Sequence, residues 1–281
     1  MQTMEAKRKN ELQQIACRIR LGIIEGVHAA KSGHPGGSLS IADILAYLYF
    51  EHMNINPAEP KAPGRDRLVL SKGHAAPALY AALAERGYFD RAELLRLRHI
   101  GSILQGHPDM KHIPGVDMSS GSLGQGISAA CGMALSAKHF GDSFRVYTIL
   151  GDGEIEEGQV WEAAMFAGNK GLSNLTAFVD LNRLQIDGTI DEVNSAEPVD
   201  KKFEAFNWYV IKINGHDFEQ IESALKEAET VDKPVAIIAE TVKGKGVSYM
   251  ENAVGWHGSA PNDEQYEIAM NELKAQLASL Q

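Results

Sequence analysis

Apolar residues recur along the chain in two patterns, one with the spacing of amphipathic helices and one of short runs typical of buried strands. The first pattern predicts helices over residues 5–31, 40–52, 76–86, 91–99, 125–139, 160–169, 219–229 and 263–280. The second predicts strands over residues 68–70, 146–150, 175–179, 208–213 and 235–240. Strands separated by helices in this order predict an α/β fold, a doubly wound and mainly parallel sheet flanked by helices.

Local signals set several of the predicted boundaries. The glycine-rich run Lys31–Gly37 interrupts the first helix. Ser40, followed three residues later by Asp43, has the spacing of a capping box and predicts the start of the second helix. Gly87 predicts the end of the helix that precedes it.

Length and charge narrow the class of protein. A chain of 281 residues can form one large α/β domain or two small ones. Its net charge of −10 argues against nucleic acid and anionic membranes as partners, since both require basic surfaces. Cys17 and Cys131 lie far apart in apolar, helix-like segments, as expected for reduced core thiols. No signal peptide and no apolar stretch of membrane-spanning length is recognised, so a soluble, cytoplasmic protein is expected.

Two successive predicted strands end in side chains with oxygen donors. Asp152, within a Gly-Asp-Gly sequence, follows strand 146–150, and Asn182 follows the next strand along the chain. A hard divalent cation prefers oxygen ligands and often completes its shell with phosphate and water. Gly151 and Gly153 would let a phosphate approach the backbone closely. The pattern predicts a site for a metal and a diphosphate at this edge of the sheet.

Two other interpretations compete for this segment. Gly-Asp-Gly is also a common turn at the end of a strand. A dinucleotide-binding loop is not supported, because the next glycine after Gly153 is Gly158 and the G-x-G-x-x-G spacing is not met.

Further candidate residues lie in glycine-flanked loops. Four of them are histidines, which can move protons near neutral pH: His34, His74, His107 and His257. Any one of them taken alone is more often a solvated surface residue. A four-histidine metal site is a rival interpretation, but no pair has the short spacing of a zinc site.

Two more loops carry donors suited to an anion. Residues 119–126 combine glycines and hydroxyls at the start of a predicted helix, which suits a planar ring or a phosphate, although a plain helix start is equally compatible. Lys243 follows the last predicted strand and could reach an anion at the sheet edge. A solvated lysine is the more common case.

In sequence order these segments resemble the amino-terminal, pyrophosphate-binding domain of transketolase. The segments that match are residues 31–36, 71–74, 106–108, 121–126, 151–153 with Asn182 and 185–188, and 256–258. Each is weak alone, whereas their shared order is specific. The resemblance covers nearly the whole chain and implies a single domain over residues 1–281. Two departures are Ser122, where many members carry proline, and Gly37, where a small hydroxyl residue is often found.

The resemblance implies thiamine diphosphate and Mg²⁺ as cofactors. The implied metal ligands are Asp152, Asn182 and the main-chain carbonyl of Leu184. The implied cofactor-binding residues are His74, Gly121, Ser122, Leu123, Gly153, Glu154, Asn182, Lys243 and His257. The implied catalytic, substrate-facing residues are His34, His107 and His257.

The resemblance also implies a partner. Single-chain transketolases continue into a pyrimidine-binding half, which supplies a glutamate for the cofactor and most arginines for the sugar phosphate. This chain is therefore expected to be one half of a split transketolase, with two copies of each chain, that moves a two-carbon ketol unit between sugar phosphates. A related transferase for a modified or sulfonated sugar and a non-catalytic regulatory module are the alternatives. Deoxyxylulose phosphate synthase fits the His107 and 121–126 loops less well.

Overall fold

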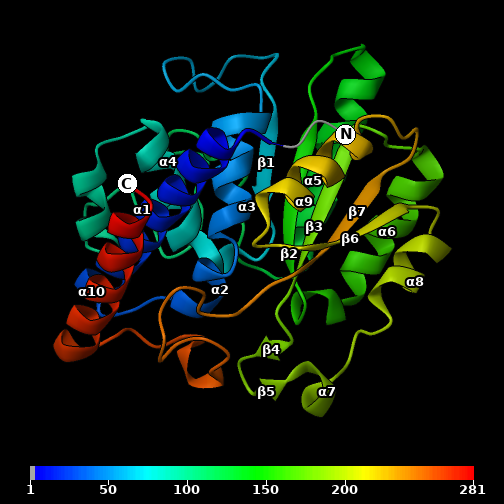
Figure 1. Ribbon diagram of the computed structural model, residues 1–281. Coiled ribbons are helices and arrows are strands. Elements are labelled where there is room, and N and C mark those ends of the chain that lie inside the picture. The colour runs from blue at the N-terminus through cyan, green and yellow to red at the C-terminus, as the bar shows by residue number, and fades with distance from the viewer. Residues whose placement is uncertain (1–3) are drawn as a thin grey trace.

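Five parallel strands form the central sheet of the computed structural model, which describes residues 4–281 (Figure 1). The strands are β1 (Arg67–Leu70), β2 (Val146–Gly151), β3 (Leu175–Leu181), β6 (Tyr209–Asn214) and β7 (Val235–Glu240). Their order in the sheet is β1-β2-β3-β7-β6, and every neighbouring pair is parallel. The predicted α/β fold with a mainly parallel sheet is confirmed.

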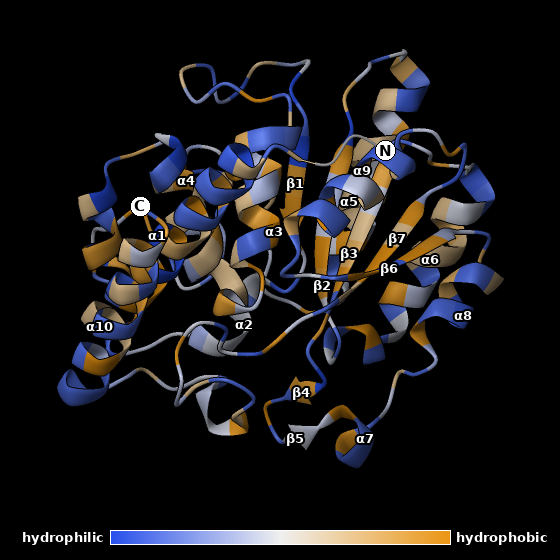
Figure 2. Ribbon diagram, in the orientation of Figure 1, coloured by the Kyte–Doolittle hydropathy of each residue, from blue (hydrophilic) through white to orange (hydrophobic). Residues whose placement is uncertain are grey.

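Helices cover both faces of this sheet. One apolar core joins the sheet to α1 (Ala6–Ala30), α2 (Pro35–Leu39), α3 (Ala42–Tyr47), α4 (Ala76–Arg86), α9 (Phe218–Ala228) and α10 (Asp263–Ser279). A second core joins it to α5 (Gln125–Phe140), α6 (Gly158–Lys170) and α8 (Val199–Ala205). Along β2, Tyr147 points into the first core and Leu150 into the second. Because both faces are covered, β2 and β3 are apolar almost throughout (Figure 2).

The segment after β3, for which the sequence predicts neither helix nor strand, contains short elements. A small antiparallel hairpin pairs β4 (Leu184–Gln185) with β5 (Gly188–Thr189), and the one-turn helix α7 (Ile190–Val193) follows. The hairpin projects beyond the carboxyl ends of the central strands, at the bottom of Figure 1. Such two-residue strands carry too short a pattern to be read from sequence.

The capping-box prediction at Ser40 is wrong. Helix α3 begins at Ala42 with Ile41 as its N-cap, and a π-helical turn, η1 (Leu48–His52), continues it. The Ser40 hydroxyl instead donates to the Asp180 carboxylate at 2.7 Å. A buried carboxylate is costly unless hydrogen-bond donors surround it, whereas the end of a helix can be satisfied by other groups.

Two other boundaries differ from the prediction. Helix α2 begins at Pro35, inside the run that was expected only to interrupt the first helix. Proline fits the first turn of a helix, so it can start one here. The helix expected over residues 91–99 is a 3₁₀ helix, η3 (Arg91–Arg96), capped by the Asp90 side chain. Gly87 adopts a left-handed φ of 93° and ends α4 as predicted.

Both cysteines are free and buried, as expected for core thiols. In the described part of the chain, residues 4–281, none of the helices combines the length and the hydropathy needed to span a bilayer.

Candidate functional site

A cavity of about 300 Å³ opens at the carboxyl edge of the sheet, where doubly wound folds bind their ligands. Four of its polar residues lie just beyond strand ends. Asp152 and Asn182 directly follow β2 and β3, whereas Lys72 lies two residues after β1 and Lys243 three residues after β7. The parallel register brings the ends of β2 and β3 together, since Gly151 pairs with Asp180. The strand-end side chains predicted from the sequence therefore lie together in one cavity.

Most of the residues singled out from the sequence line this cavity. They are His34, His74, Gly121, Leu123, Asp152, Gly153, Glu154, Asn182, Leu184, Lys243 and His257. Ser122 and His107 are not among the lining residues. The structure thus gathers these side chains, while their individual roles stay predictions.

His107 nevertheless lies beside the cavity wall. Its ring packs against Gly121, where a Cβ would stand 3.2 Å from the imidazole. Gly121 also has a φ of 149°, a backbone conformation that favours glycine. The predicted histidine loop and the predicted glycine loop therefore touch.

The Asp152 carboxylate is 4% exposed and is held by the backbone around it. Its Oδ1 accepts from the Gly153 N–H at 2.9 Å and its Oδ2 from the Arg183 N–H at 2.5 Å. Burial and the neighbouring Asp180 raise the pKa of Asp152. This buried carboxylate lacks a full counter-charge, and a divalent cation would supply it.

The other two candidate ligands are oriented by hydrogen bonds. Asn182 donates its amide N–H to Asp180 at 3.0 Å, which turns the amide oxygen towards the Leu184 N–H, 3.1 Å away. The Leu184 carbonyl accepts from Lys243 Nζ at 2.7 Å. A carboxylate, an amide oxygen and a carbonyl form the hard-oxygen donor set that Mg²⁺ prefers, so these residues fit the implied metal.

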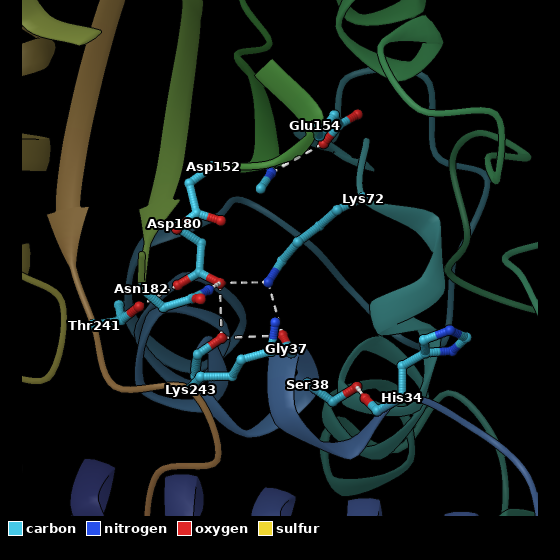
Figure 3. A network of polar contacts seen from close by, with 12 residues as sticks. His34, Gly37, Ser38, Lys72, Asp152, Glu154, Asp180, Asn182, Thr241 and Lys243 are labelled. Atoms are coloured by element: carbon cyan, nitrogen blue, oxygen red, sulfur yellow. Dashed lines mark hydrogen bonds and ion pairs between the residues drawn. The ribbon is translucent and has the colours of Figure 1, made fainter. Parts of the chain in front are cut away.

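Lys72 and Asp180 are a buried ion pair that the sequence analysis missed. Lys72 Nζ lies 2.6 Å from Asp180 Oδ2 and also donates to the Gly37 carbonyl at 2.7 Å (Figure 3). Asp180, fully buried, also accepts from the hydroxyls of Ser40 and Thr241. An acid inside a mostly apolar strand, two residues before Asn182, was the available signal.

Glu154 ties the glycine-hydroxyl loop to the end of β2. Its Oε1 accepts from the Ser71 hydroxyl at 2.5 Å and from the Gly124 N–H at 2.9 Å, and its Oε2 accepts from the Gly151 N–H at 3.0 Å. Burial raises the pKa of this carboxyl in spite of those bonds. Every oxygen of Glu154 is thus engaged within the protein, which suits a scaffold for the loop.

Three of the predicted histidines face one another in the cavity. The ring centroids of His34, His74 and His257 are 5.2 to 5.5 Å apart. Burial and then the charge of Arg98 lower the pKa of His34 to about 4, and burial and then the charge of Lys243 lower that of His257 to about 3. Burial likewise lowers the pKa of His74. All three rings are therefore neutral near pH 7, so each can accept or donate a proton.

Lys243 fixes the tautomer of His257. Its Nζ lies 2.8 Å from His257 Nδ1, and an ammonium group can only donate. The ring hydrogen of His257 is therefore on Nε2.

Across residues 4–281 no group of three or more His, Cys, Asp and Glu side chains is placed to hold a metal.

These lowered pKa values predict acid sensitivity of the cofactor-free protein. An unfolded histidine has a pKa of about 6.5, whereas folded His34 and His257 have values of about 4 and about 3. Between these values the unfolded chain binds more protons, so the free energy of unfolding should fall as the pH is lowered below about 6.5. Urea unfolding across this pH range measures the slope. The slope should be shallower in His257→Asn, and an equal slope would contradict the assignment.

Comparison with known proteins identifies relatives over nearly the whole chain. A family model described as the transketolase, thiamine diphosphate binding domain matches residues 11–277. The chain is 48% identical to the 6-deoxy-6-sulfo-D-fructose transketolase subunit of Clostridium sp. strain MSTE9, over 94% of this chain and 96% of that protein. It is 43% identical to an apulose-4-phosphate transketolase subunit of Phocaeicola vulgatus, over 96% of each.

Longer relatives match over only part of their length. Rat transketolase is 44% identical over 95% of this chain and 43% of its own. The crystal structure of transketolase from Campylobacter jejuni superimposes with a TM-score of 0.88 at 33% identity, covering 96% of this chain and 46% of that one. The chain thus spans less than half of these two transketolases.

Proposed function

The chain belongs to the transketolase family, through its thiamine diphosphate-binding domain, and we propose that it is the amino-terminal subunit of a two-chain transketolase. As a single domain over residues 1–281, it would work with a separate subunit carrying the pyrimidine-binding half. The observation that carries the proposal is the meeting of Asp152, Asn182 and the Leu184 carbonyl at the strand ends of one cavity. The two relatives of matching length, both named as subunits, support the split arrangement.

In this proposal the cavity holds thiamine diphosphate and Mg²⁺. The oxygens of Asp152, Asn182 and Leu184 would bind the metal. His74, Lys243 and the backbone of the 121–123 and 153 segments would bind the diphosphate, since they bring N–H donors and positive charge to the cavity. When bound there, thiamine diphosphate would supply the carbon nucleophile needed for two-carbon transfer.

The histidines would orient the sugar and move protons. His34 and His107 are assigned to the hydroxyls of the donor ketose, and His257 to proton transfer at the reacting carbon. A neutral imidazole can either donate or accept, which matches proton traffic in both directions of a reversible transfer. Burial, followed by the charge of Arg98, lowers the pKa of His107 as well, so it belongs to the same neutral set.

The donor sugar divides the proposal in two. One form is transfer between ordinary ketose and aldose phosphates. The other is transfer from a modified or sulfonated sugar, favoured by the 48% identity to a protein named for 6-deoxy-6-sulfo-D-fructose. The residues that read the far end of the sugar are expected on the partner chain, so both forms share the same cavity chemistry.

A donor panel tests the proposed activity. We expect this chain and its partner together to transfer a two-carbon unit to an aldose phosphate only when thiamine diphosphate and Mg²⁺ are present. The donors to compare are xylulose 5-phosphate, fructose 6-phosphate, 6-deoxy-6-sulfofructose and apulose 4-phosphate, with the aldehyde product measured for each.

His107→Ala serves as the matched variant in this assay. It should lower kcat/KM for the best donor by about 100-fold, as expected when the donor ketose loses a hydroxyl contact that positions it, with cofactor affinity nearly unchanged. Absence of transfer from any ketose by the loaded pair would rule out the enzymatic proposal and favour the regulatory module.

A further inference from the structure

A buried ionic cluster lies outside the cavity and is not used by the proposed mechanism. Arg20 from α1 donates to both oxygens of Asp43 from α3, at 3.1 and 2.5 Å. His216, in the loop after β6, places its Nδ1 2.7 Å from Asp43 Oδ2. Arg20 and Asp43 are 7% and 5% exposed, and the His216 side chain is 14% exposed. Burying three ionisable groups together is costly unless each is fully paired.

The second ring nitrogen of His216 reaches the loop after β7. Val242 donates its backbone N–H to His216 Nε2 at 2.9 Å. Because a backbone N–H can only donate, Nε2 must be an acceptor and the ring hydrogen must be on Nδ1. The Nδ1–H therefore points at Asp43, and one continuous chain of bonds runs from Arg20 to Val242.

Val242 directly precedes Lys243, and the backbone of this segment is held on both sides of that lysine. Gly244 donates its N–H to the Gly36 carbonyl at 3.0 Å, and the Thr241 hydroxyl donates to Asp180. The Lys243 side chain then reaches Leu184 O and His257 Nδ1. Of these anchors, the bond from Val242 to His216 is the nearest to Lys243 on its amino-terminal side.

The charges of the cluster keep Asp43 ionised and His216 in a single tautomer. Burial works to raise the pKa of Asp43, but the charge of Arg20 and the hydrogen bonds from His216 and Arg20 outweigh it and bring the pKa to about 2. Asp43 is therefore ionised throughout the physiological range and holds the Nδ1–H tautomer of His216. That tautomer is the one that can accept from Val242.

We propose that His216, held by Asp43 and Arg20, is a positioning residue that fixes the backbone at residues 241–244 so that Lys243 reaches the metal-diphosphate end of the cavity. This inference rests on the proposed function, because it gives Lys243 the diphosphate as its ligand. His216 does not itself line the cavity among the described residues, so it acts through Lys243.

A double-mutant cycle on cofactor affinity tests this inference. The chain is used together with its partner, and thiamine diphosphate is titrated in the presence of Mg²⁺ by calorimetry. His216→Ala should weaken binding by about tenfold, in the range seen when outer-shell partners of a site are lost. In a Lys243→Met background the same substitution should change the affinity by less than about twofold, because a residue that acts through Lys243 has nothing left to position.

His52→Ala is the matched control. His52 is a similarly buried histidine, 10% exposed in its side chain, and its Nε2 bonds the Tyr147 hydroxyl at 2.9 Å, away from the cavity residues. It should cost a comparable loss of stability with unchanged cofactor affinity. If His216→Ala does not fold, Asp43→Asn enters the same cycle and should show the same dependence on Lys243.

Three outcomes separate the possibilities. Unchanged cofactor affinity in His216→Ala overturns the inference. So does a loss of affinity that is equal in the wild-type and Lys243→Met backgrounds. The same two results overturn it when Asp43→Asn is the variant used. A weakening that disappears in the Lys243→Met background supports it. Failure of the wild-type pair to bind thiamine diphosphate contradicts the proposed function instead.

Discussion

Asp152→Ala is expected to abolish Mg²⁺-dependent retention of thiamine diphosphate, with a loss of affinity greater than about 100-fold. Losing an outer-shell partner of a metal ligand already weakens metal binding by about 10- to 100-fold. Asp152 is itself a proposed ligand and the charged member of the set, so its loss should cost more. The fold should survive, because burial and Asp180 raise the pKa of this carboxyl and its charge burdens the cofactor-free protein. Calorimetry on the pair of chains measures the affinity, and thermal unfolding without cofactor measures the stability.

Asp152→Asn separates charge from shape in that experiment. The amide keeps an oxygen able to accept from the Gly153 or Arg183 N–H but removes the negative charge. We expect the cofactor-free stability to stay near that of the wild type while most of the affinity is lost. Wild-type affinity for thiamine diphosphate in both variants would contradict the assignment of Asp152 as a metal ligand.

The strands and the strand-end ligands could be predicted because their causes are local. A strand buried on both faces is apolar almost throughout, so β2 and β3 stand out in the sequence. The residue after each strand then falls at the carboxyl edge, where parallel neighbours meet. Asp152 and Asn182 follow from that rule alone.

The rest of the site depends on contacts between distant segments. Ser40 has a local helix-capping pattern, yet its hydroxyl binds Asp180, a residue 140 positions away in the sequence. His216 and Asp43 are separated by 173 positions. No periodicity or spacing encodes such pairs, because they arise only when the sheet has brought its edges together. For the same reason each loop histidine could be proposed singly, whereas the mutual contact of His34, His74 and His257 could not.

The exposed side of the cavity leads to the last prediction, that this chain alone will not catalyse ketol transfer. Leu123 and Ile186 line the cavity and are 37% and 61% exposed, as expected for apolar groups that a cofactor and a partner would cover. Of the described residues, the carboxylates that line the cavity are Asp152, Glu154 and Asp180, and each is already bonded within the protein. None is free to bond the aminopyrimidine of the cofactor, so the glutamate implied by the family resemblance is expected from another chain.

We therefore expect the purified chain to show less than about 1% of the activity of the assembled pair, because acid–base groups contribute at least about 100-fold to such steps. The experiment is to co-purify the partner from the native cell, mix the separated chains, and follow two-carbon transfer together with the mass of the assembly, for which two copies of each chain are expected. A mixture containing Asp152→Ala should assemble and remain inactive, which separates assembly from cofactor loading. Full activity from this polypeptide with no second protein present would refute the split-enzyme proposal, because the cavity would then be complete without a partner.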